Sequence, residues 1–131
     1  MGCFNCLDDK VKDNKEHRNT QLYLTCNIEN DTLSGLFRWA CHDNIFGFKI
    51  NENYIITSYN CTLMIFVEGI KERKGKCELI LNDKNKYIED SNQTNKLVRV
   101  TYSGRFKMKD RIFVDFINVK NIQMVIYGHI I

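Results

Sequence analysis

From Thr20 onward, apolar and polar residues alternate with a period of two, which is typical of strands with one buried face. The run Leu22–Ile28 is the clearest case, because every second residue is apolar and the residues between are Tyr, Thr and Asn. Further runs follow at short spacing. The expected strands cover residues 20–28, 36–41, 45–50, 54–59, 62–67, 77–81, 96–103, 105–109, 112–119 and 122–130.

Short polar sets separate these runs and predict turns. They are His42-Asp43-Asn44, Asn51-Glu52-Asn53, Gly69–Gly75, Asn82-Asp83, Ser91-Asn92 and Ser103-Gly104. No stretch shows a convincing helical stripe, and at most one short helix is expected, near Asp83–Asn95. The sequence therefore predicts an all-β fold, a single antiparallel β-sandwich or barrel of about eight to ten strands.

The chain of 131 residues divides into a polar N-terminal arm and one domain. Residues 1–19 are expected to be flexible, and residues 20–131 to form the β-rich globular domain. No apolar run approaches the ~18 residues of a membrane-spanning helix, and no secretory signal is seen. A cytoplasmic location and reduced cysteines are therefore expected. Asn, Ile and Lys are abundant while Pro is absent, which indicates an AT-rich genome rather than a function for the asparagines.

The N-terminal run Met1-Gly2-Cys3-Phe4-Asn5-Cys6 matches a lipidation signal. Removal of Met1 exposes Gly2 for myristoylation, with Cys3 and Cys6 as palmitoylation sites, Cys3 being favoured; Cys6 stands where the usual pattern has Ser or Thr. One myristoyl chain binds a membrane only marginally, so a palmitoyl chain is needed for stable anchoring. The alternative is that Met-Gly and two nearby cysteines occur together by chance.

The Met-Gly-Cys start resembles the N-termini of Src-family kinases and G-protein α subunits. That resemblance implies palmitate on Cys3, beside the myristoylated Gly2. The layout, a lipidated tip before a small β-rich domain, is similar to that of acylated pleckstrin-homology proteins of apicomplexan parasites.

Positive charge is concentrated late in the chain, although the net charge is only +3. The alternation of Arg105, Lys107 and Lys109 with apolar residues places three cations on one face of an expected strand. An anion-binding surface is predicted from Lys71, Arg73, Lys74, Lys76, Arg99, Arg105, Lys107, Lys109 and Arg111. Its expected ligand is the anionic lipid of a cytosolic membrane surface. Nucleic acid is unlikely, because no stacking aromatic motif accompanies the cations; the alternative interpretation is a solvated, charge-protected edge strand.

No catalytic or metal-binding pattern emerges. Cys41-His42-Asp43 are consecutive, so on an extended chain they point to alternate faces and do not form a catalytic trio. A zinc site would have to combine Cys3 and Cys6 with Cys41 and His42, and this spacing lacks a second close pair of recognisable form. No metal, no cofactor and no enzymatic activity are therefore expected.

The function predicted from these features is a non-catalytic binding module, tethered to a membrane by myristoylation and palmitoylation. It binds an unknown protein partner or anionic lipid headgroups. Two alternatives remain: a soluble β-barrel that binds an apolar small molecule, and a soluble viral or bacterial protein-binding inhibitor.

Overall fold

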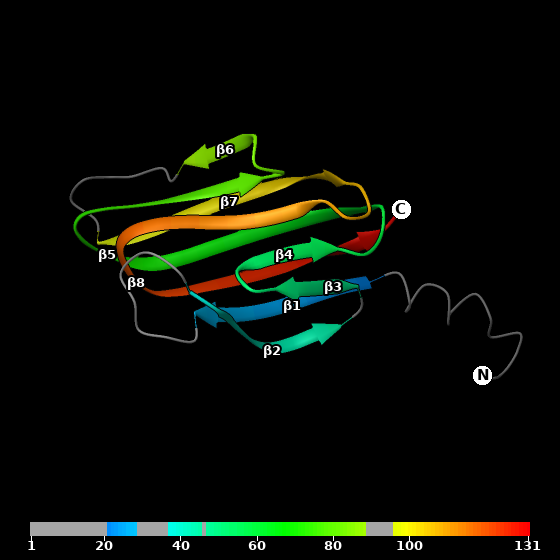
Figure 1. Cartoon of the computed structure of the whole chain (residues 1–131), viewed down its shortest axis with the longest axis horizontal. Helices are drawn as coiled ribbons and strands as arrows, with labels where there is room; N and C mark the ends of the chain where they lie inside the picture. Colours follow the sequence, from blue (N-terminus) through cyan, green and yellow to red (C-terminus); the bar gives the residue numbers. More distant parts are fainter. Residues whose placement is uncertain (1–20, 29–36, 46, 89–95) are drawn as a thin grey trace, which may run out of the picture.

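The computed structural model describes residues 21–28, 37–45, 47–88 and 96–131, and every regular element in these ranges is a β-strand (Figure 1). The strands pair antiparallel, which confirms the predicted all-β antiparallel class. They are β1 (Gln21–Ile28), β2 (Trp39–Ile45), β3 (Phe48–Asn51), β4 (Tyr54–Thr57), β5 (Cys61–Leu81), β6 (Asn85–Ile88), β7 (Leu97–Phe106) and β8 (Arg111–Ile130).

Two long strands, β5 and β8, form the spine of the fold and belong to both of its layers. They pair from Cys61 opposite Ile130 to Leu81 opposite Ile112, with a register irregularity between Lys71 and Lys76. Around this irregularity Lys74 and Asn118 take positive φ values of 58° and 56°, so both strands bend there. The bend carries the chain from one layer into the other.

The resulting architecture is a two-layer jelly roll. The first layer has the strand order β2-β1-β8-β5-β7 and uses the C-terminal half of β8 with the N-terminal half of β5. The second layer has the order β3-β4-β8-β5-β6 and uses the other halves of the two long strands. We call these layers the first sheet and the second sheet.

Two of the predicted turns are wrong, because both segments lie inside strands. The segment Gly69–Gly75 belongs to β5, where Gly69 lies opposite Val98 of β7. The segment His42-Asp43-Asn44 belongs to β2, where Asp43 lies opposite Thr25. Local polarity indicated a break at both places, but the residues on either side pair with neighbouring strands, and the strand is interrupted only by a bulge in each segment.

A third predicted turn, Ser103-Gly104, is also wrong, and this changes the prediction for the cations. β7 runs through it, with Gly104 opposite Leu63, and ends only at Phe106. The chain reverses at residues 107–110 instead, where Lys109 has a φ of 71°. Lys107 and Lys109 therefore lie in a turn rather than on a strand face with Arg105.

Other turns follow the prediction. Asn51 pairs with Tyr54 across the β3–β4 hairpin. Asn82 and Asp83 have φ values of 54° and 60°, and the amide of Lys84 donates to the Leu81 carbonyl (3.1 Å), as in a type I′ turn. The short helix allowed near Asp83–Asn95 is not formed over residues 83–88, which are turn and strand; residues 89–95 lie outside the described residues.

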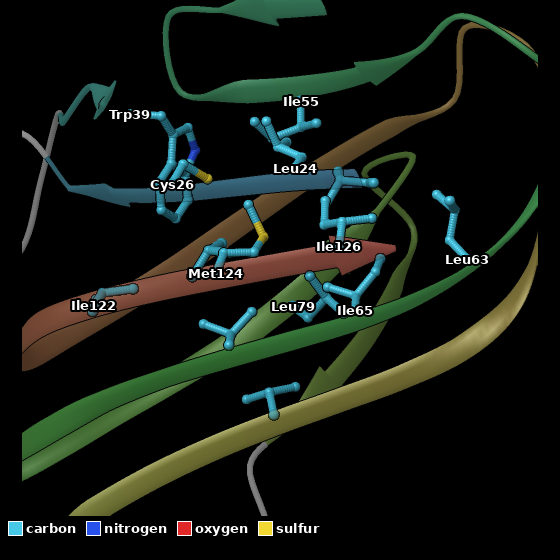
Figure 2. Packing of buried hydrophobic residues seen from close by; sticks show 14 of the residues in the cluster. Leu24, Cys26, Trp39, Ile55, Leu63, Ile65, Leu79, Ile122, Met124 and Ile126 are labelled. Carbon is cyan, nitrogen blue, oxygen red and sulfur yellow. The ribbon is translucent and has the colours of Figure 1, made fainter. Parts of the chain in front are cut away.

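The core lies between the two sheets and consists of alternate residues from both layers (Figure 2). Leu24, Ile65 and Ile126 come from the first sheet, and Leu79 and Ile112 from the second, all with no exposed surface. Among the described residues the polar residue that is buried is Thr57, and the indole of the buried Trp39 donates to the Asn53 carbonyl (3.0 Å). The domain is therefore stabilised mainly by apolar contacts between its sheets.

Candidate functional site

The predicted lipidation residues Gly2, Cys3 and Cys6 lie outside the described residues. The structure does describe where they join the domain. β1 begins at Gln21, which pairs with His129 of β8, and His129 in turn lies opposite Thr62 of β5. Thr62 lies opposite Arg105 of β7, so the chain enters the domain at the end that carries the β7–β8 turn (Figure 1).

The predicted anion-binding cations do not form one surface. Four of them, Arg105, Lys107, Lys109 and Arg111, lie at the end of the sandwich with the β7–β8 turn. A second group lies at the opposite end, at the bend of β5, and consists of Lys71, Arg73, Lys74 and Lys76. The side chain of Arg73 is outside the described part of the structure.

Two of the predicted cations already have carboxylate partners. Arg99 lies on β7 and forms an exposed ion pair with Glu68 of β5, with 2.8 Å between its Nη2 and Oε2. Arg111 forms an ion pair with Asp83 and lies over the ring of Tyr54, 5.7 Å from its centroid. These pairs reduce the positive charge available to an external anion.

The consecutive residues Cys41 and His42 have separate partners, as expected for neighbours on an extended strand. The Cys41 thiol hydrogen-bonds with Cys26 of β1. Nε2 of His42 donates a hydrogen bond to Oδ1 of Asn27. No group of three or more His, Cys, Asp or Glu side chains among the described residues could hold a metal ion.

The outer face of the first sheet carries an apolar surface that the sequence analysis did not predict. We call it the aromatic face; its residues are Tyr23, Met64, Phe66, Val125 and Tyr127. Each alternates along its strand with buried core residues and therefore points away from the core. Met64 and Tyr127 are 38% and 40% exposed although both are large and apolar.

Strand register arranges these residues in two adjacent rows across three strands, β1, β8 and β5. In the first row Tyr127 lies between Tyr23 of β1 and Met64 of β5. In the second row Val125 lies beside Phe66. The rings of Phe66 and Tyr127 stack, with centroids 5.7 Å apart and an interplanar angle of 17°, and so join the rows.

Polar residues complete and border these rows. Ser103 and Thr101 of β7 continue the two rows beyond Met64 and Phe66. On β1, β8, β5 and β7 formal charge appears only in the next row on either side, at Arg105 and at the Glu68–Arg99 ion pair, while Asp43 of β2 ends the second row opposite Thr25. An apolar, uncharged centre with a polar rim is the composition of a protein–protein contact surface.

Comparison with known proteins shows the fold. No family model matches the chain, and no curated protein matches it. The crystal structure of murine APRIL at pH 8.5 superposes with a TM-score of 0.65 at 8% sequence identity, covering 82% of this chain and 98% of that one. The globular domain of zebrafish complement 1qA protein superposes with a TM-score of 0.52 at 11% identity, covering 84% of this chain and 97% of that one. The chain shares their fold. At these identities the likeness extends to the architecture alone.

The sequence carries one signal for the aromatic face. In the run Leu63-Met64-Ile65-Phe66-Val67 every residue is apolar, so both faces of the strand are apolar. Such a run is typical of a strand covered on both sides. In the described part of the structure one side of this run packs in the core, and the other side faces outward.

The interior does not favour the small-molecule alternative. The space between the sheets holds apolar side chains, among them Leu63, Ile65 and Leu79, none of which has exposed surface (Figure 2). Barrels that bind apolar ligands keep an internal cavity instead. The structure also describes no helix of the length and apolarity needed to cross a membrane.

Proposed function

We propose that this protein is a non-catalytic protein-binding module that uses the aromatic face as its contact surface. The observation that carries the proposal is the pair of rows centred on Tyr127, uncharged from β1 to β7, in which large apolar side chains remain exposed on a well-paired sheet. Exposed apolar surface that is contiguous and rimmed by polar groups marks sites of association. The alternatives, a soluble small-molecule carrier and a soluble inhibitor, lack a comparable observation on the described residues.

The partner that we propose for the aromatic face is a second copy of this chain. The centre of the aromatic face is uncharged, and the rim charges of Glu68 and Arg99 neutralise one another. A second copy therefore meets no like-charge repulsion there, although the chain carries a net charge of +3. The cations that would select an acidic partner lie mainly at the two ends of the sandwich, away from this centre.

The size of the face sets the expected strength of the contact. Its five residues lie on three strands ~4.8 Å apart and in two rows about 7 Å apart, so the apolar centre covers on the order of 200 Å². Stable complexes bury about 800 Å² on each partner. We therefore expect concentration-dependent association rather than a permanent oligomer.

The experiment is sedimentation equilibrium of the full chain over a range of micromolar concentrations. We expect the apparent mass of the wild type to rise with concentration. Tyr127→Arg and Met64→Arg should each lower the apparent mass to the mass of a monomer, because the new arginine would be buried without a partner in the contact between the two copies. Met108→Arg is the matched control, since Met108 is 54% exposed but lies in the β7–β8 turn.

Two results would contradict self-association through this face. One is a monomeric wild type throughout the range, and the other is equal loss of association in Met108→Arg and Tyr127→Arg. Fluorescence of Trp39, which is 5% exposed, checks that each variant is folded.

The proposal has a second part, a membrane tether of myristate on Gly2 and palmitate on Cys3 or Cys6, on the cytosolic side of a membrane. The residue types of the N-terminal run support it. So does the position of β1, because Gln21 enters the domain at the end that carries Arg105, Lys107 and Lys109. An acylated tip would bring these cations close to anionic headgroups.

Labelling with a myristate analogue in eukaryotic cells tests the tether, with Gly2→Ala as the control. Flotation of the acylated protein with vesicles of phosphatidylcholine and phosphatidylserine tests the cations. We expect Lys107→Glu/Lys109→Glu to weaken binding and Lys74→Glu/Lys76→Glu, at the opposite end, to leave it nearly unchanged. Absence of label, or equal effects of the two double substitutions, would contradict this part and leave the aromatic face untouched.

A further inference from the structure

Two cysteines from neighbouring strands lie directly opposite each other. Cys26 of β1 and Cys41 of β2 are register partners, and their thiols share a hydrogen bond. Directly opposite residues of an antiparallel pair have Cα atoms about 4.5–5.5 Å apart. That separation falls inside the ~4.4–6.8 Å range over which a disulfide closes without backbone movement.

A β-bulge produces this pairing. Thr25 lies opposite Asp43, but the next residue, Cys26, lies opposite Cys41, so His42 is the extra residue on β2. The bulge is held by the hydrogen bond from His42 to Asn27. Without the extra residue Cys26 would face His42, and the two sulfur atoms would not meet.

The two thiols differ in solvent exposure. An exposed thiol can react first with an oxidant, and a buried neighbour can then displace the adduct to form the disulfide. Cys26 is 3% exposed and packs in the core near Trp39 (Figure 2). Cys41 is exposed and lies on β2, the outermost strand of the first sheet. The two other described cysteines are buried and have other register partners: Cys61 lies opposite Phe106 and Cys77 opposite Phe116.

We propose that Cys26 and Cys41 are a modification site at which a reversible cross-strand disulfide forms. The oxidant is a small-molecule disulfide of the glutathione type. The Cys41 thiolate attacks this disulfide, a mixed disulfide forms on Cys41, and one glutathione leaves as a thiolate. Cys26 then attacks the Cys41 sulfur, and the second glutathione leaves. Two cysteine thiols are oxidised, one glutathione disulfide is reduced, and the two protons pass to the departing thiolates.

The ionisation of the pair sets the order and the pace of these steps. Burial raises the pKa of both thiols, and Cys26 is the more deeply buried of the two. The hydrogen bond that Cys26 donates acts in the opposite direction on the pKa of Cys41, because it stabilises the Cys41 thiolate. Cys41 is therefore the thiol that ionises first, and the reaction is slow at neutral pH.

The disulfide would tie the outermost strand β2 to β1 and close the chain between residues 26 and 41. Cross-linking a loop of this length restricts the unfolded chain, so the melting temperature should rise by about 5–10 °C. This inference is independent of the proposed function, because the pair lies on the core side of β1 and not on the aromatic face.

The test is incubation of the folded full chain with glutathione disulfide, then alkylation and digestion with trypsin. Cleavage after Arg18, Arg38 and Lys49 separates Cys26 from Cys41, so the disulfide appears as one species joining peptides 19–38 and 39–49. We expect this species in the wild type, with the peptides that contain Cys61 and Cys77 left unlinked. Dithiothreitol should separate the pair and reverse the rise in melting temperature.

Two variants test which cysteine reacts first and which one closes the disulfide. Cys26→Ser should stop at a glutathione adduct on Cys41, because the resolving thiol is gone. Cys41→Ser should leave the buried Cys26 unmodified. Free thiols at both positions after prolonged incubation, or linkage of either cysteine to a different one, would overturn the proposal.

Discussion

Thr57 and Asp110 are joined by two hydrogen bonds across 53 residues of chain. The amide of Thr57 donates to the Asp110 carbonyl (3.0 Å), and the amide of Asp110 donates to the Thr57 hydroxyl oxygen (3.0 Å). The same hydroxyl donates to the carbonyl of Lys107 (2.6 Å). A buried side chain of β4 thus closes the β7–β8 turn, where two of the exposed cations lie.

Thr57→Val removes both hydroxyl hydrogen bonds while keeping the shape of the side chain. The Lys107 carbonyl and the Asp110 amide lose the hydroxyl but keep a hydrogen bond to each other (3.1 Å), so we expect the free energy of unfolding to fall by about 1 kcal/mol. Urea unfolding followed by Trp39 fluorescence measures it. Thr101→Val, at an exposed position of β7, should change stability by less than ~0.5 kcal/mol. Equal losses in the two variants would show that the hydroxyl is not a structural tie.

Gly128 of β8 is required by a close approach of backbone. A Cβ at this position would lie 1.9 Å from the carbonyl oxygen of Thr62, which belongs to the paired strand β5 and cannot move aside. We expect Gly128→Ala to cost about 3 kcal/mol or more, or to prevent folding. A thermal melt of the soluble protein measures the loss.

Gly104→Ala is the matched control for this substitution. A Cβ on Gly104 would meet the phenol of the Tyr102 side chain, with its nearest atom, the hydroxyl oxygen, at 2.6 Å. Because Tyr102 is only half-buried, its ring can shift, and the cost should be clearly smaller. A Gly128→Ala protein as stable as Gly104→Ala would contradict the close approach.

The buried thiol of Cys61 should make the folded protein less stable in alkali. Burial, with a smaller contribution from the charge of Asp110, raises the pKa of its thiol from 9.0 to about 11. The folded state thus keeps the proton longer than the unfolded state does. The stability linked to this thiol is therefore fully present below pH 9 and is lost as the pH rises from 9 to 11.

Comparison with Cys61→Ala isolates this effect, because all other titrating groups are common to both proteins. The variant should be less stable than the wild type at pH 7, since a buried sulfur is removed. The difference should shrink between pH 9 and pH 11. Free energies of unfolding from urea titrations at each pH measure it, and a difference that stays constant would contradict the raised pKa.

The ion pair between Arg99 and Glu68 should contribute little to stability. Both side chains are substantially exposed, 58% and 44%, so water and salt screen their attraction. A double-mutant cycle with Arg99→Ala and Glu68→Ala should give a coupling energy of about 0.2–1 kcal/mol, decreasing with added salt. A larger, salt-independent coupling would mean that this rim of the aromatic face is desolvated.

The short-range features of the fold could be predicted because short-range chemistry decides them. Alternation in Leu22–Ile28 predicted β1, since one face of that strand is buried and the other is not. Asn82 and Asp83 predicted the β5–β6 turn, since both residue types tolerate the positive φ that the turn requires. The all-β antiparallel class followed from many such segments together.

The long strands could not be predicted in the same way. Gly69–Gly75 has the composition of a loop, yet β5 continues through it because Gly69 and Ile70 pair with β7 and Lys71 and Lys76 pair with β8, with a bulge between those two lysines. The same holds for Ser103-Gly104, and the error there placed Lys107 and Lys109 on a strand face that ends at Phe106. Local sequence does not contain the position of a partner strand.

The sequence by itself determined the class of the fold, because the period of apolar residues specifies which side of each strand is buried. Only the tertiary structure decided which residues lie together on one surface. It separated the predicted cations to opposite ends of the sandwich, since β5 and β8 bend between the two sheets. It also brought Phe66 onto Tyr127 and Cys26 opposite Cys41, since strand register couples residues that are distant along the chain.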